Sequence, residues 1–375
     1  MTTPYFIFDA HLDLSMNALE WNRDLRWPLE KIRRWEMYMR DKPDRGNNTV
    51  CFPEMRRGRV GLCVATQIAR YSPYFHRLPG WNSPEQAWAQ TQGQLAWYRA
   101  MEEQGELKQI RNLPELEAHL QLWLTAPPCD DGTPYVQESL KTPRQLPIGF
   151  ILSLEGADSL VTLKHLERSY EQGLRAVGLS HYGPGRYAYG TDAEGPLPAE
   201  GKALLREMRR LNMILDVTHL CDQCFWEALE VFDGPIWASH QNCRVLAPWN
   251  RQFADDQIRA VISRGGVLGM AFDAMMMAPG WKHLQTRPQD IQLKMSRIVE
   301  HIDRICQLAG NARHVGIGTD LDGGFGTEQM PLDMNSIADL QQLPGMLRSR
   351  GYPEEDIERI MWRNFVDFLR TTWKE

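Results

Sequence analysis

Residues Ile148–Glu155 read IGFILSLE, an almost entirely apolar run that ends in one carboxylate. Such a continuous run is typical of a strand buried on both faces, as in a parallel sheet. Similar runs, followed by segments of helical periodicity, recur at Phe6–Asp13, Val60–Ile68, Arg175–His181, Met213–His219, Ile236–His240, Gly266–Phe272 and His314–Asp320. Eight strands that alternate with helices predict an α/β fold, a (β/α)₈ TIM barrel. A doubly wound sheet is the alternative, but no glycine-rich dinucleotide turn follows the first strand.

The chain has 375 residues, more than the roughly 250 of a plain barrel, so we expect insertions. Asn17–Arg59 shows no strand alternation, and Ala126–Pro147 contains five prolines. We interpret them as insertions after the first and second strands of a single barrel domain that spans residues 1–375. Helices are predicted at Glu85–Glu103, Leu160–Gln172, Ala199–Leu211, Cys221–Phe232, Asp255–Arg264 and Gln289–Leu308.

The composition is that of an ordinary globular protein, with 43% hydrophobic and 24% charged residues. A net charge of −6 argues against a nucleic-acid partner. No segment approaches the roughly 18–20 apolar residues of a membrane span. The opening MTTPYFIFDAHLDL and the closing TTWKE predict neither a signal peptide nor a lipid anchor. We therefore expect a cytoplasmic protein with reduced thiols, in which the unmatched CxxC of Cys221 and Cys224 is structural.

Most of the predicted strands end in, or run into, a side chain that can bind a metal or move a proton. These side chains are His11, Asp13, Glu155, His181, His219, His240, Asp273 and Asp320. The carboxyl ends of barrel strands meet at one mouth, where active sites lie. His11 and Asp13 are two residues apart, so both point to the same side of a strand. Glu155 could bridge two cations, and the nitrogen and oxygen donors suit zinc or another divalent first-row metal.

A single histidine after an apolar run is more often a core or cap residue than a ligand. Here three strand ends that carry histidine occur together with an HxD pair and an isolated glutamate, a combination that favours a metal centre. The remaining histidines lack this context and are interpreted as structural: His76, His119, His165, His283, His301 and His314.

The motifs FDAHLDL, SLEGADSL, AVGLSHYG, ILDVTHL, IWASHQN and HVGIGTDLDG occur in this order along the chain. In them the chain resembles the membrane dipeptidase (renal dipeptidase) family of binuclear zinc peptidases, peptidase family M19, from Phe8 to about Phe368. The resemblance implies a (β/α)₈ barrel enzyme that cleaves dipeptides, tolerates a D-configured C-terminal residue and forms a homodimer. It also implies two Zn²⁺ per chain, one held by His11, Asp13 and Glu155 and the other by Glu155, His219 and His240.

The resemblance further assigns substrate and catalytic roles. Asp320 would lie beside the bridging water, and His181 would contact the substrate near the scissile carbonyl; with Glu155 they would be the catalytic residues. His181 and Asp320 would also contact the substrate, and Arg251 would bind the free carboxylate of the substrate. The family usually has Arg-Asn at this point, whereas this chain has Asn250-Arg251-Gln252, so a surface ion pair is the alternative for Arg251.

Other segments depart from the family pattern and concern specificity. The loop after His181 reads YGPGRYAYG, and AFDAMMM follows the seventh strand. Met275–Met277 would give the mouth an adaptable wall, and Asp273 could be a helix cap or a contact to substrate.

Two other functions stay open on sequence grounds. The first is a related metal-dependent amidohydrolase acting on an N-acyl amino acid, cyclic amide or lactone. Such barrels often have HxH on the first strand and a modified lysine as the bridge, whereas here the strand carries HxD and Glu155 takes the bridging place. The second is a non-catalytic metal-binding scaffold with a decayed site, against which the retention of every expected ligand argues.

Overall fold

The computed structural model describes residues 4–73, 79–126, 135–136 and 144–373. The predicted barrel is confirmed: eight parallel strands follow one another in the order β10-β11-β1-β2-β6-β7-β8-β9. An isolated parallel bridge between Ala238 and Leu268 nearly closes the ring. The strands are β1 (Ile7–Leu12), β2 (Val60–Gln67), β6 (Ile148–Glu155), β7 (Leu174–Gly178), β8 (Ile214–Asp216), β9 (Ile236–Trp237), β10 (Leu268–Met270) and β11 (Val315–Ile317).

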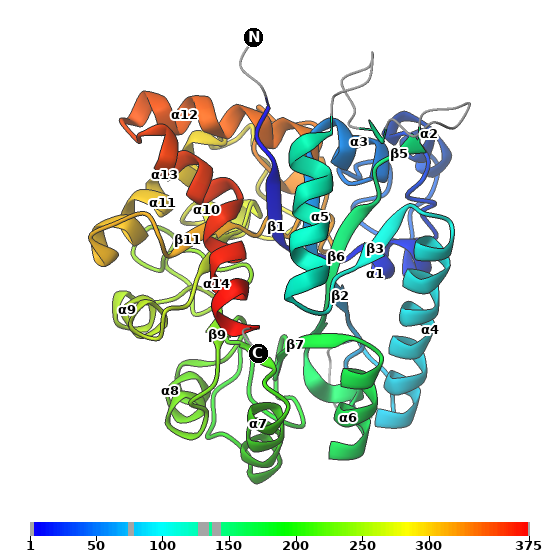
Figure 1. The fold of residues 1–375 in the computed structure, drawn as a ribbon, viewed down its shortest axis with the longest axis vertical. Coiled ribbons are helices and arrows are strands. Elements are labelled where there is room, and N and C mark those ends of the chain that lie inside the picture. The colour runs from blue at the N-terminus through cyan, green and yellow to red at the C-terminus, as the bar shows by residue number, and fades with distance from the viewer. Residues whose placement is uncertain (1–3, 74–78, 127–134, 137–143, 374–375) are drawn as a thin grey trace.

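Helices surround the strands, with α4 and α6 on one side and α9 and α11 on the other in Figure 1. The helices that follow or cover the barrel strands are α4 (Pro84–Glu103), α5 (Leu113–Thr125), α6 (Leu163–Glu171), α7 (Ala199–Arg210), α8 (Asp222–Val231), α9 (Asp255–Ser263), α10 (Ala274–Met277), α11 (Ser296–Ala309), α12 (Leu343–Arg350), α13 (Glu354–Glu358) and α14 (Asn364–Thr372). Short 3₁₀ segments are η1 (Ala157–Ser159), η2 (Thr327–Gln329) and η3 (Ile337–Gln342), and η4 (Arg359–Arg363) is a π-helical turn.

The first insertion contains helices and no strand, namely the end of α1 (Leu14–Glu20), then α2 (Leu29–Glu36) and α3 (Phe52–Arg57). The second insertion lies mostly outside the described residues; its described part holds the short pair β4 (Tyr135–Val136) and β5 (Arg144–Gln145). The sequence did not predict helix α5 or the short strand β3 (Leu107–Gln109), which pairs with β6.

The helix predicted over Gln289–Leu308 begins late, at Ser296, so its first turns were wrong. Gln292 has a left-handed φ of 50°, which an α-helix cannot contain. The amide of Met295 instead donates to the Asp333 carboxylate at 2.7 Å. The helix ends at Gly310, which adopts φ 71° as a left-handed glycine C-cap.

The core explains why the apolar runs became strands. Every residue of β1, β2 and β6 is buried, as expected for strands covered on both faces. On the outer side the Phe8 and Phe365 rings lie 5.3 Å apart, which joins β1 to α14. Gly316 on β11 allows this approach, because a Cβ there would lie 2.7 Å from the Phe365 ring. One buried hydrophobic cluster includes residues from Phe6 to Leu369, while the single-domain organisation over 1–375 stays a prediction.

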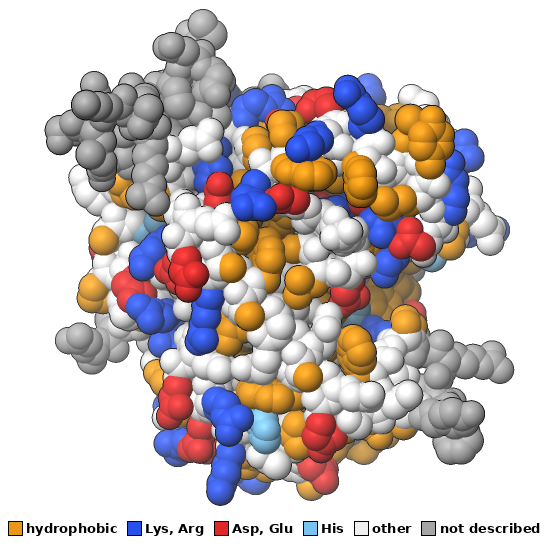
Figure 2. Space-filling view, turned by 90° about the vertical axis from the view of Figure 1, so that its right-hand side faces the viewer, with side chains coloured by type: hydrophobic (Ala, Val, Ile, Leu, Met, Phe, Trp, Pro, Cys, Tyr) orange, Lys and Arg blue, Asp and Glu red, His pale blue; other side chains and the backbone are white. Residues whose placement is uncertain are grey.

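The described surface carries charges of both signs. On the face shown in Figure 2, Lys and Arg side chains are interspersed with Asp and Glu and with scattered hydrophobic groups. Within the described residues, no helix has the length and apolar character that crossing a membrane requires.

Candidate active site

The predicted site residues lie together at the carboxyl ends of the barrel strands. His11 is on β1, and Asp13 follows it as the N-cap of α1. Glu155 is the last residue of β6. The other four follow the ends of their strands: His181 after β7, His219 after β8, His240 after β9 and Asp320 after β11.

One carboxylate oxygen is the meeting point of four imidazoles. Distances from Glu155 Oε1 to the Nε2 atoms are 3.3 Å for His219, 3.5 Å for His240, 3.6 Å for His11 and 3.8 Å for His181. All but His181 are at most 8% exposed. The sequence-based expectation that these strand ends converge therefore agrees with the geometry.

The donor atoms fit divalent cations. His11, Asp13 and Glu155, the predicted first ligand set, form one group with metal-ligand spacing. Glu155 also groups with His181 and His219. The Nε2 atom of His11 is buried and lacks a hydrogen-bond partner among the described residues. The Nε2 atoms of His219 and His240 face each other at 3.1 Å. A bound cation would satisfy these buried nitrogens.

Hydroxyl groups orient the candidate ligand side chains. Thr191 Oγ1 lies 2.9 Å from His219 Nδ1, and Ser239 Oγ lies 2.9 Å from His240 Nδ1. Thr66 donates to the Asp13 carboxylate. Each contact leaves Nε2, or the second carboxylate oxygen, directed into the cluster, which is how outer residues tune a metal site. Sequence reasoning missed these hydroxyls; Ser239 is the most visible of them because it directly precedes His240.

Burial dominates the electrostatics of the cluster. It raises the pKa of Glu155 and of Asp320, with the neighbouring Asp13 carboxylate adding to both shifts. Burial also lowers the pKa of His219 and His240 well below the usual value, which keeps these imidazoles in the neutral form that binds metals. His11 behaves differently: burial opposes its charge, but Glu155 and Asp13 raise its pKa well above the usual value.

Arg251 is buried beside this cluster rather than on the surface. Only 3% of it is exposed, and it donates to Gln241 Oε1 at 2.8 Å and to the His240 carbonyl at 2.9 Å. Among the described residues, no carboxylate lies within ion-pair distance of its guanidinium. It lines a cavity of about 200 Å³ together with Asp13, Glu155, His181, His219, Asp320 and Met276. The alternative of a surface ion pair for Arg251 was therefore wrong.

Asp273 lines the same cavity and is also a helix cap. Its carboxylate accepts from the amide of Met275 at 2.9 Å and from the Gln329 side chain at 2.9 Å. Burial raises its pKa to about 6. Met276 adds the predicted thioether wall.

A second cavity of about 370 Å³ shares Met16, Trp21, Ile68 and His181 with the first.

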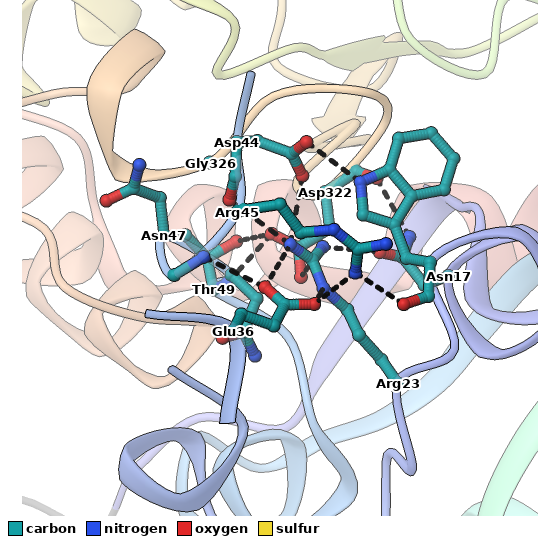
Figure 3. Close-up of polar contacts among 12 residues, drawn as sticks. Asn17, Arg23, Glu36, Asp44, Arg45, Asn47, Thr49, Asp322 and Gly326 are labelled. Carbon is teal, nitrogen blue, oxygen red and sulfur yellow. Dashed lines mark hydrogen bonds and ion pairs between the residues drawn. The ribbon is translucent and has the colours of Figure 1, made fainter. Parts of the chain in front are cut away.

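A buried polar network ties the first insertion to the site (Figure 3). The Asn17 amide donates to the Asp13 carbonyl at 3.0 Å and to the Asp322 carbonyl at 2.8 Å. Arg23 donates to Asn17 Oδ1 at 2.7 Å. The Asp322 carboxylate accepts from both the amide and the hydroxyl of Thr49 at 2.7 Å. The insertion thus holds the segments that carry Asp13 and Asp320.

The backbone is left-handed at two of the site residues, with φ of 68° at His219 and 60° at Asp320. Non-glycine residues adopt this region at a cost and often at functional sites.

Cys221, two residues after His219, is the N-cap of α8 and accepts from the amide of Cys224. Both cysteines are buried, as expected for a structural pair.

The fold and this cluster define a metal-binding hydrolase barrel. The model of the membrane dipeptidase family, peptidase family M19, matches residues 133–374, more than half of the chain. The chain belongs to this family, and the prediction of a metal-dependent dipeptidase-class hydrolase is confirmed at that level.

Related proteins share moderate identity with the chain. An uncharacterized protein in the pqqA 5′ region of Klebsiella pneumoniae is 29% identical over 221 residues, which cover 56% of this chain and 77% of that protein. Dipeptidase tcpJ of Claviceps purpurea is 26% identical over 233 residues, 59% of this chain but only about half (51%) of that protein.

Solved structures support the fold. A metallo peptidase from Rhodobacter sphaeroides, liganded with a phosphinate mimic of the dipeptide L-Ala-D-Ala, aligns with a TM-score of 0.74 and 20% identity. The alignment covers 99% of this chain and 100% of that one. The probable dipeptidase PvdM from Pseudomonas aeruginosa aligns with a TM-score of 0.72 and 17% identity, over 98% of this chain and 96% of that one.

Proposed function

We propose that this chain hydrolyses the amide bond of dipeptides at a centre of two zinc ions. The proposed ligands are His11, Asp13, Glu155, His219 and His240. The observation that carries the proposal is Arg251, a buried cation without a carboxylate partner among the described residues, in the same small cavity as the ligand cluster. A free α-carboxylate would supply that partner, with the paired hydrogen bonds that a guanidinium forms best.

The protein side chains divide the work by position. Divalent ions held by His11, Asp13, Glu155, His219 and His240 would supply Lewis acidity and would lower the pKa of a nearby water molecule. Arg251 binds the substrate carboxylate and so places the scissile amide over the cluster. His181 donates a hydrogen bond to the carbonyl oxygen, which gains negative charge during attack. Asp320, 3.8 Å from His11 Nε2, accepts a proton from the attacking water and transfers it to the leaving amine.

Tolerance of a D-residue at the C-terminal position is part of the proposal. The Rhodobacter sphaeroides relative binds a mimic of L-Ala-D-Ala. In this chain the thioether of Met276 lines the cavity, and methionine adapts its shape to different side chains. We also propose a cytoplasmic location, a homodimer and a single domain over residues 1–375.

Matched substrates test the proposal. Free-acid dipeptides in L-L and L-D forms, and their C-terminal amides, are assayed with zinc-loaded protein whose metal content is measured. We expect hydrolysis of the free acids, and Arg251→Ala should weaken their kcat/KM by roughly 2–4 kcal/mol, about 30- to 700-fold. Arg209→Ala is the control, because Arg209 is exposed and pairs with Asp233 outside the cavity. A preference of the unaltered enzyme for amides would instead favour the N-acyl or cyclic-amide hydrolase alternative.

A further inference from the structure

Arg70 contacts His181 from the side opposite the ligand cluster. One of its terminal nitrogens, Nη2, lies 2.7 Å from His181 Nδ1, and the other, Nη1, donates to the Pro79 carbonyl at 2.9 Å. The Arg70 side chain lies in the second cavity, and His181 forms a wall shared by both cavities. Arg70 therefore approaches the site only through His181.

The surroundings of Arg70 do not suggest a structural ion pair. Within the described part of the chain, no carboxylate lies at ion-pair distance from its guanidinium, and its buried Nε atom has no hydrogen-bond partner. Holding a half-buried cation without a carboxylate partner costs stability. The short contact with His181 is thus the most specific interaction that Arg70 makes.

The chemistry of this contact fixes the position of a proton. A guanidinium has N–H donors and no acceptor, so His181 Nδ1 must be the acceptor. A neutral imidazole whose Nδ1 accepts carries its hydrogen on Nε2. In His181 that atom lies 3.8 Å from Glu155 Oε1, on the side of the cluster.

The neighbouring histidines lack this constraint. Nδ1 of His219 faces the Thr191 hydroxyl, and Nδ1 of His240 faces the Ser239 hydroxyl. A hydroxyl can donate or accept, so each ring is free to place its hydrogen on Nδ1 and present an Nε2 lone pair to a cation.

The distinction matters because spacing alone would allow His181 to be a ligand. Its ring groups with Glu155 and His219 at metal-ligand distances. An Nε2 atom that carries hydrogen cannot coordinate a metal, but it can donate to a substrate oxygen.

We propose that Arg70 is a positioning residue that keeps His181 in its Nε2–H form, so that His181 donates a hydrogen bond to the substrate carbonyl and does not bind metal. The catalytic part of this inference rests on the proposed dipeptidase function. The assignment of the proton does not depend on which substrate is cleaved.

Nitrogen NMR tests the proton position directly. Zinc-loaded protein labelled with ¹⁵N in its histidine rings is recorded, and the His181 signals are identified by their loss in His181→Gln. We expect the Nε2–H pattern for His181 in the unaltered protein and its loss in Arg70→Met. Arg70→Lys, which keeps the positive charge and a nitrogen that can donate but not accept, should retain at least part of it. An Nδ1–H or metal-bound pattern in the unaltered protein, or an unchanged pattern in Arg70→Met, would overturn the proposal.

Kinetics and metal content provide the second readout. Arg70→Met should lower kcat on the order of 10- to 100-fold, the range for losing an orienting partner, while KM changes little. Arg70→Lys should recover part of the rate. Arg186→Met is the matched control: Arg186 donates to the Leu160 carbonyl at 2.9 Å and, in the part of the chain that the structure describes, forms no hydrogen bond with His181. An equal loss in this control would mean that Arg70 only supports the fold. An Nε2–H pattern without any dipeptide hydrolysis would refute the proposed function and leave the proton assignment standing.

Discussion

Replacing Arg23 with methionine should destabilise the protein strongly and loosen its metal site. Arg23 is 2% exposed, and its guanidinium donates to both oxygens of Glu36, at 2.9 and 3.0 Å, and to Asp44 Oδ2 at 3.0 Å. Methionine would fill much of the space but would supply no donor to either carboxylate. Figure 3 shows how many contacts of the network meet at this one side chain.

The magnitude follows from burial of the partners. The side chains of Glu36 and Asp44 are 1% and 0% exposed, so solvent cannot replace the lost donors. Removing one member of a buried ion pair typically costs about 3–5 kcal/mol. Arg45 still contacts Glu36, which places the expected loss toward the lower end of that range. Since Asn17 loses its contact with Arg23, metal affinity should also fall, by roughly 10- to 100-fold.

Urea unfolding and competitive zinc titration measure the two effects. Arg26→Met is the control, because Arg26 lies three residues further on, is exposed and pairs with an exposed Asp24. That pair should contribute less than about 1 kcal/mol. If the two variants unfold at the same urea concentration, the network does not stabilise the protein as reasoned. If zinc affinity is unchanged in Arg23→Met, the network does not contribute to metal binding.

Three further outcomes are expected. Glu155→Gln should reduce the content of both metals as measured by elemental analysis, since its carboxylate lies among all four imidazoles; loss of one ion alone would argue against a bridge. Asp320→Asn should lower kcat by about 10²–10⁴-fold with metal content kept; loss of metal would make Asp320 a ligand instead. Burial lowers the pKa of His119 and His301 to about 4, so the folded state takes up their protons less readily than the unfolded chain. The stabilisation from each neutral histidine should be complete well above pH 6.5 and should fall by about 1 kcal/mol between pH 7 and 5.5; pH-dependent urea unfolding of His119→Gln and His301→Gln should show a flatter decline, and an unchanged decline would contradict this origin.

The barrel was predictable because its strands are coded locally. Each of the eight apolar runs overlaps one observed strand, since burial on both faces requires continuous apolar sequence. Most of the runs overestimated strand length, as at β8 and β9. The Asp216 carboxylate, at the end of β8, accepts from the amides of Thr218 and Ser239, which takes these residues out of the strand ladder. Asp9 similarly accepts from the amides of His11 and Thr319.

The convergence of the ligand residues was predictable for the same reason, because strand ends of a barrel meet at one mouth. The supporting contacts were not predictable. Arg70 and His181 are 111 positions apart, and Thr49 and Asp322 are 273 apart. Neither Arg70 nor Thr49 carries a local signal that distinguishes it from an ordinary surface arginine or loop threonine. Only the folded arrangement of the insertion and the barrel brings such pairs together.

The left-handed backbone at His219 and Asp320 implies a trade-off between catalytic activity and conformational stability. Each conformation costs about 1–3 kcal/mol, and glycine would adopt it without that penalty. A glycine at either position would relax the chain while deleting a group that the proposed chemistry needs. Laboratory selection for heat resistance alone would therefore enrich inactive molecules altered at these positions. A more stable variant would need stabilising substitutions at other positions of the barrel, and its turnover would have to be measured after every round of selection.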